Sequence, residues 1–267
     1  MAFFEQLAEY PNYTILIFAI VYFVAGLIDA VVGGGGLLTV PMLLINLPHQ
    51  PLATLFGTNK IAAISGGTVA AFQYSKRITF NYKLLFSIIV VAVISSFCGA
   101  KIVSQIDSKQ LKPFMLLIII AIAIYTFIKK DFGAIATKDL KLSRQLIYGC
   151  IIGFFVGFYD GFFGPGTGSF FVLGFIVLLG FDFLHASAYA KVVNCFTNFG
   201  ALIVFISQGN YILPLAILMA ICNILGNYMG TKMAFKNGNS FIRKFFLIVL
   251  SLMILRFGYD VYLIYKN

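Results

Sequence analysis

Two lysines and two aspartates stand at matching places inside apolar stretches of this sequence. Lys60 follows Asp29 by 31 residues, and Lys191 follows Asp160 by the same interval. A charged side chain within a membrane span costs about 2.5–3.5 kcal/mol on insertion scales, so it needs a partner or a polar cavity. Two cations lining one cavity would attract a small anion, and a nearby carboxylate could relay a proton. We therefore interpret the lysines as anion ligands and the aspartates as groups for proton coupling or ion pairing.

Other polar and glycine residues near these charges extend the candidate site. The amides and hydroxyls precede or follow the lysines, and the glycines form two runs that follow the aspartates. A glycine run lets the chain turn, and the free N–H groups of the helix that starts there favour an anion. The further predicted substrate-binding residues are Thr58, Asn59, Asn194, Gly35, Gly36, Gly166, Thr167, Gly168 and Ser169.

A purely structural interpretation of the four charges is also open. Asp29 would pair with Lys60 and Asp160 with Lys191, giving two neutral buried ion pairs that lock helices together. The equal spacing in both places favours this interpretation as much as it favours a cavity. The ion-pair interpretation and the cavity interpretation are compatible if a bound anion competes with each aspartate for its lysine.

The composition is that of an integral membrane protein. Of 267 residues, 61% are hydrophobic and 10% charged, and the mean hydropathy is +0.98, far from soluble domains. The formal charge of +10 is spread over short connections between apolar runs, which argues against nucleic acid as a partner. The four cysteines stand singly in apolar stretches, without the spacing of a metal site or a disulfide framework. We expect no cofactor.

The apolar runs predict an all-α, polytopic fold. A helix needs about 20 apolar residues to cross the hydrocarbon layer. Plain spans are expected at 52–75, 82–104, 111–129, 186–207, 212–231 and 242–264. Two longer tracts, 13–47 and 146–180, are cut by glycine runs, so each predicts a helix pair joined at a break. The sequence leaves open whether each pair crosses the membrane fully or enters and returns.

An internal repeat organises these segments. A shift of 131 residues superposes Asp29 on Asp160 and Lys60 on Lys191 without a gap. This divides the chain into a first repeat at 1–128, a cytoplasmic linker at 129–145 and a second repeat at 146–267. Three plain spans and one broken pair give each repeat an odd number of crossings, so the second copy must be inverted. Inverted repeats with broken helices at the midplane are typical of secondary transporters.

The basic residues indicate how the chain is oriented. Twelve Lys and Arg residues fall on one side of the predicted spans, and four fall on the other, namely Lys101, Lys109, Lys112 and Lys266. Cytoplasmic loops carry the excess of basic residues. Both termini are therefore expected outside, in a multi-pass protein of the cell membrane.

The chain resembles the sulfite exporter TauE/SafE family, also called the toluene sulfonate uptake permeases. The resemblance rests on the segments 26–36 and 57–60 in one half, and on 157–166 with Ala190, Lys191 and Asn194 in the other. It implies a two-repeat carrier for small sulfur-containing anions such as sulfite, sulfoacetate or sulfonates, with the breaks and the two lysines as anion contacts. Pro165 and Thr167 replace a plain glycine run in the second copy, so strict symmetry of the site does not follow.

These observations favour a secondary transporter of small anions, with possible proton coupling, that uses alternating access around a midplane site. An anion channel on the same fold is the alternative. An enzyme is not expected, because the sequence offers neither a nucleophile with a nearby base nor a metal-ligand spacing. The expected partners are a small anionic substrate and the lipid bilayer.

Overall fold

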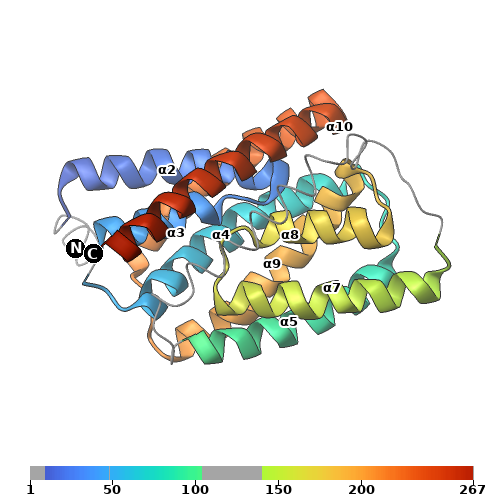
Figure 1. Ribbon diagram of the computed structural model, residues 1–267, viewed down its shortest axis with the longest axis horizontal. Coiled ribbons are helices and arrows are strands. Elements are labelled where there is room, and N and C mark those ends of the chain that lie inside the picture. Colours follow the sequence, from blue (N-terminus) through green and yellow to red (C-terminus); the bar gives the residue numbers. More distant parts are fainter. Residues whose placement is uncertain (1–9, 48, 104–139, 267) are drawn as a thin grey trace.

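The computed structural model describes residues 10–47, 49–103 and 140–266, and these residues are helical apart from short connections. These described residues form eight α-helices and one π-helical turn, most of which run along the long dimension of the molecule (Figure 1). The expected all-α class is therefore confirmed for the described residues. The predicted span 111–129 and most of the predicted linker 129–145 lie outside them.

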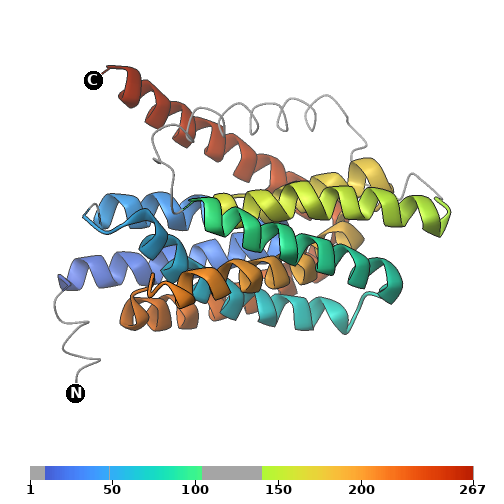
Figure 2. The ribbon, with the colours of Figure 1, turned by 90° about the horizontal axis from the view of Figure 1, so that it is seen from below.

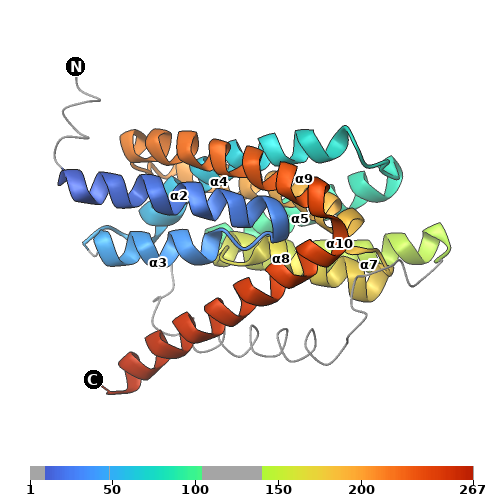
Figure 3. The same cartoon turned by 90° about the horizontal axis from the view of Figure 1, so that it is seen from above.

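The first broken tract forms helix α2 (Asn12–Val32) and the shorter α3 (Gly36–Asn46). Gly33 ends α2 in the left-handed conformation at φ 80°, and its N–H donates to the carbonyl of Asp29 at 2.8 Å. Figure 3 shows that α3 turns back toward the end of the molecule where α2 begins. The first break therefore reverses the chain direction.

The second broken tract repeats this arrangement. Helix α7 (Leu142–Phe162) begins four residues before the predicted start, and the break leads to α8 (Thr167–Gly174) and a π-helical turn (Phe175–Leu179). Gly164 and Gly166 adopt φ values of 95° and 82°, which only glycine takes up without strain. Helix α8 returns toward the start of α7 (Figure 1), and its first six residues are buried in protein. Polar backbone at this break is thereby kept away from lipid.

Four long helices surround the two breaks. They are α4 (Leu52–Ser75), α5 (Tyr82–Val103), α9 (Phe183–Ser207) and α10 (Leu213–Lys266). Gly238, at φ 66° and ψ −164°, divides α10 into two helices that diverge in Figure 2. These helices match the predicted spans at 52–75, 82–104, 186–207, 212–231 and 242–264.

Among the residues that the structure describes, five helices are long and apolar enough to cross a membrane, which supports a multi-pass protein. They are α2, α5, α7, α9 and the part of α10 from Leu213 to Gly238. Helix α4 has 24 residues but is more polar, because it carries Thr58, Asn59 and Lys60 in one stretch.

Glycines let two helix pairs approach closely. Helix α2 packs on α10, where a Cβ at Gly226 would overlap the carbonyl oxygen of Phe23. Helix α5 packs on α7, where a Cβ at Gly157 would lie 2.6 Å from the carbonyl oxygen of Ala92. Such contacts are typical of membrane helices, which associate through close backbone packing because lipid provides no hydrophobic drive.

Replacing Gly226 tests this packing. We expect Gly226→Ala to destabilise the protein by about 1–3 kcal/mol, because the new methyl group would push α10 away from α2. Thermal unfolding in detergent measures the effect. Gly67→Ala is the matched control, since a Cβ at this helical position meets nothing within 4 Å. Equal melting temperatures for the two variants would contradict the packing argument.

Candidate functional site

The two glycine breaks contact each other at the centre of the molecule. The backbone N–H of Ser169 donates to the carbonyl of Gly33 at 3.3 Å, and its hydroxyl donates to the carbonyl of Val32 at 2.9 Å. The backbones of Gly33 and Gly168 lie so close that neither position has room for a side chain. Helix α8 of one half therefore satisfies carbonyls at the end of α2 in the other.

Two ion pairs flank this contact, and each joins the two halves of the sequence. The Nζ atom of Lys60 lies 2.9 Å from Oδ2 of Asp160, and Nζ of Lys191 lies 2.8 Å from Oδ2 of Asp29. The alternative pairing of Asp29 with Lys60 and of Asp160 with Lys191 is therefore wrong. Equal spacing along the chain does not decide which helix lies nearest in space, and each lysine meets the broken helix of the opposite half.

The two ion pairs differ in their surroundings. Lys60 also donates to the backbone carbonyl of Asp160 at 2.9 Å, so it binds the end of α7 twice. The Asp160 side chain is 2% exposed, whereas that of Asp29 is 19% exposed. Lys191, the partner of Asp29, is itself almost completely buried. One carboxylate is thus enclosed and the other is accessible.

A cavity of about 40 Å³ lies beside the ion pairs, with space for about three water molecules at ~10–15 Å³ each. It is lined by nine of the predicted site residues: Asp29, Gly36, Asn59, Lys60, Asp160, Gly166, Thr167, Gly168 and Asn194. Gly33, Gly164 and Asn198 also line it, as do Phe56, Ala63 and Phe163. The residue types of Phe56, Ala63 and Phe163 gave no signal of a binding site in the sequence. Gly33 and Gly164, in contrast, belong to the same glycine runs as the predicted residues.

Four predicted site residues are not among those that line the cavity. Lys191 is held by Asp29, which does line it. The Thr58 hydroxyl donates to Thr54 and accepts from the N–H of Ile212, so it ties α4 to the start of α10. Ser169 binds Val32, and Gly35 packs on α2, where a Cβ would lie 2.8 Å from Cβ of Asp29. Lys191, Ser169 and Gly35 therefore contact α2, whereas Thr58 joins α4 to the start of α10.

The amides of the cavity are held by neighbouring groups. Oδ1 of Asn59 accepts from the hydroxyl of Tyr22 at 2.9 Å. The side chain of Asn198 donates to the carbonyl of Asn194 at 2.6 Å. The Lys60 ammonium donates one hydrogen bond, to the backbone carbonyl of Asp160, and its contact with the Asp160 carboxylate is an ion pair. The cavity therefore offers one ammonium group, several amides and a helix start, which together suit a small anion.

Comparisons with known proteins agree with a membrane location. The family model described as sulfite exporter TauE/SafE matches residues 18–257. The chain is 35% identical over 238 residues to a "probable membrane transporter protein" of Haemophilus influenzae, covering 89% of this chain and 92% of that protein. It is 32% identical over 250 residues to the "probable membrane transporter protein YfcA" of Escherichia coli K12, covering 92% and 91%. No solved structure matches significantly.

Paired substitutions test the exchanged ion pairs. We expect Lys60→Gln to destabilise the protein by about 3–5 kcal/mol, because it leaves the buried Asp160 carboxylate unpaired. Adding Asp160→Asn should restore most of this loss, since the pair is then neutral. Adding Asp29→Asn to Lys60→Gln is the matched control, and it should worsen the loss by freeing Lys191. Thermal unfolding in detergent measures all four proteins, and rescue by Asp29→Asn instead would contradict the pairing.

Proposed function

This chain belongs to the sulfite exporter TauE/SafE family, and we propose that it is a secondary transporter that moves small organosulfur anions, such as sulfite, sulfoacetate or sulfonates, across the cell membrane. The single observation that carries this proposal is the position of Lys60. Its ammonium group lines a small cavity where the two broken helices meet. A buried cation and a helix start at one cavity are features that favour anion binding in such carriers.

Inverted repeats around this cavity form part of the proposal, and reciprocal contacts support them. Shifting Lys60 and Asp29 by 131 residues gives Lys191 and Asp160, and each residue binds the other's counterpart. The glycine contacts show the same reciprocal relation between residues that are 131 positions apart. Gly157 packs on Ala92, and the equivalent Gly26 packs on Asn223. An internal two-fold axis that exchanges the halves would produce this pattern.

The directions of equivalent helices also support inversion. Helices α4 and α9 are related by the 131-residue shift and run in opposite directions along the molecule (Figure 1). Two such halves can rock about the site between them, so that the cavity opens to one side and then to the other. Alternating access is therefore the transport mechanism that we propose.

The charge balance of the site favours coupling to protons. Two lysines and two aspartates form a neutral network, in which the cavity-lining ammonium is already paired. A monoanion that entered alone would leave this low-dielectric site with a net negative charge. A proton that binds with the anion restores neutrality. We therefore propose that anion and proton cross together.

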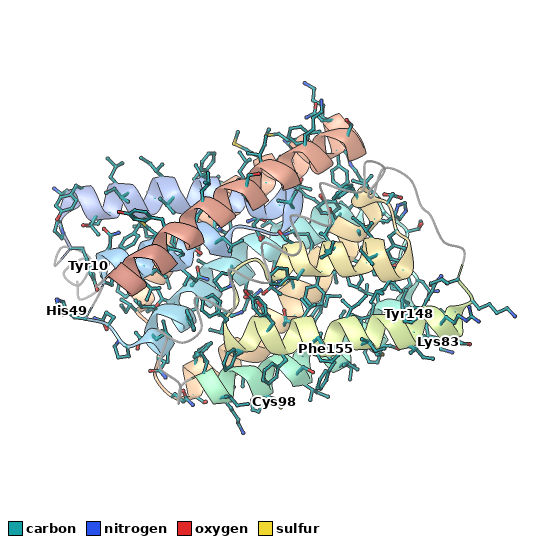
Figure 4. The ribbon with its side chains drawn as sticks, viewed as in Figure 1. Tyr10, His49, Lys83, Cys98, Tyr148 and Phe155 are labelled. Carbon is teal, nitrogen blue, oxygen red and sulfur yellow. The ribbon has the colours of Figure 1, made fainter. Side chains whose placement is uncertain are left out.

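The positions of basic residues support an orientation for the chain. Figure 4 places Lys83 and His49 at opposite ends of the molecule. The Lys83 end also holds the basic residues Lys76, Arg77, Lys141, Arg144, Lys232 and Lys236, at the ends of α4, α7 and the first part of α10. An excess of basic residues marks the cytoplasmic side. Helix α2 begins at the opposite end, so we propose that both termini lie outside.

Sulfite uptake into proteoliposomes tests the function. We expect Lys60→Gln to lose at least about tenfold in transport rate, because the loss of a charge-assisted hydrogen bond costs about 1.5–3 kcal/mol. Lys83→Gln is the matched control, since Lys83 is exposed at a helix end. An inward proton gradient should drive sulfite uphill, and an uncoupler should abolish this accumulation. Downhill flux that no gradient can drive uphill would indicate a channel instead.

Chemical labelling tests the orientation. In a variant that lacks the four native cysteines, we expect His49→Cys to react with a membrane-impermeant maleimide in intact cells. Lys83→Cys should react only after the membrane is permeabilised. Both positions are exposed, so a difference in labelling reports the side of the membrane. The reverse result would place both termini in the cytoplasm.

A further inference from the structure

The two carboxylates of the site are not equivalent, although the repeat superposes them. We propose that Asp29 carries the proton that accompanies the anion, and that Asp160 is a positioning residue that holds Lys60 against the cavity. This assignment rests on the proposed function, because it gives the two ion pairs different roles in transport. It follows from the exposure and contacts of the four charged side chains.

Asp29 is the more exposed of the two carboxylates that line the cavity, at 19% against 2% for Asp160. Its side chain is 19% exposed and lines the cavity, whereas its partner Lys191 is 1% exposed and does not line it. A proton that enters the cavity therefore meets Asp29 before it meets any part of Lys191. The described contact of the Asp29 carboxylate is with that single ammonium group, at 2.8 Å.

Asp160 contacts a single ammonium group through two of its atoms. Its backbone carbonyl accepts a hydrogen bond from Lys60 at 2.9 Å, and its buried Oδ2 forms an ion pair with Lys60 at 2.9 Å without a hydrogen bond. This carbonyl belongs to the last turn of α7, next to the break, where the helix provides no further backbone N–H donor. Lys60 therefore supplies the hydrogen bond that the carbonyl would otherwise lack. Protonation of Asp160 would remove the negative partner that keeps Lys60 in place. Its role is to fix the anion ligand.

The coupled step is a simple protonation. One O–H bond of a hydronium ion in the cavity breaks, which leaves water, and one O–H bond forms on the Asp29 carboxylate. Lys191 then loses its anionic partner, and the network gains one positive charge. The bound anion balances this charge next to Lys60. After the anion is released on the other side, Asp29 gives its proton to water there, and its carboxylate binds Lys191 again.

Other titratable groups around Asp29 do not replace it in this step. Helix α9 contributes Lys191 and Cys195, whose sulfur contacts the hydroxyl of Thr68 at 3.2 Å. Helix α4 contributes Lys60 and Tyr74, whose hydroxyl donates to the carbonyl of Ala30 at 3.2 Å. Helix α7 contributes Asp160 and Tyr159, whose hydroxyl donates to the carbonyl of Pro165 at 2.8 Å. The residues of α3 and α8 include no Asp, Glu, Lys, Arg, His, Cys or Tyr, and the polar residues of α10 buried nearest to α2 are Asn223, Asn227 and Thr231.

Proton uptake on anion binding provides the test. The purified full-length protein in weakly buffered detergent solution is mixed with methanesulfonate, which does not titrate near neutral pH, and with sulfite in a parallel series. A pH-sensitive dye counts the protons taken up, and calorimetry gives the affinity between about pH 5 and pH 8. We expect the wild type to take up about one proton per anion, with an affinity that falls as the pH rises.

Asp29→Asn and Asp160→Asn are the matched variants. Asp29→Asn should bind the anion without proton uptake and without dependence on pH, because the amide stays neutral. Asp160→Asn should bind at least about tenfold more weakly but keep the proton uptake and the pH dependence. Asp29→Asn combined with Lys191→Gln keeps the charge balance, and it should also show no proton uptake if Asp29→Asn alone proves too unstable to purify.

The outcomes separate this assignment from the proposed function. Proton uptake that persists in Asp29→Asn, or that disappears only in Asp160→Asn, overturns the assignment and leaves anion transport standing. Anion binding by the wild type without proton uptake also overturns it. A wild-type protein that neither binds nor transports sulfite or methanesulfonate overturns the proposed function, and the assignment falls with it.

Discussion

The requirement that no charge or free peptide group faces lipid governs this structure. Two glycine breaks and four ionisable side chains lie within otherwise apolar helices, and each would be costly in hydrocarbon. The fold meets this requirement by bringing all of them to one place. The breaks bind each other through Ser169 and Gly33, and the lysines bind aspartates across the same centre. The surrounding long helices then keep this polar centre away from lipid.

Much of this arrangement could be predicted from the sequence, because hydropathy and glycine runs are strong signals. The long helices and the breaks fall where they were expected, and most of the predicted site residues line one cavity. The ion-pair partners could not be predicted, since spacing along the chain says nothing about which half each helix faces. The position of Phe56 and Phe163 at the cavity could not be predicted either, because the sequence does not distinguish an apolar residue at a cavity from one in the core.

Similar halves produce an asymmetric site. Phe56 and Phe163 pack edge to face at the cavity, with ring centroids 5.8 Å apart. Their counterparts after the 131-residue shift are Ser187 and Val32, which are buried and do not line the cavity. The ion pairs are also unequal, because the Asp29 side chain is 19% exposed and that of Asp160 is 2% exposed. The two halves of the chain therefore contribute different residue types to the surroundings of the cavity.

The exchange of ion-pair partners has a consequence for biogenesis. When the first half of the chain leaves the ribosome, Asp29 and Lys60 have been made, but neither of the partners that they bind in the finished protein has been made. These two charges are therefore without their final partners until residues 160 and 191 have been synthesised. Neither half can form the polar centre alone, so the centre is complete only after both halves have been synthesised.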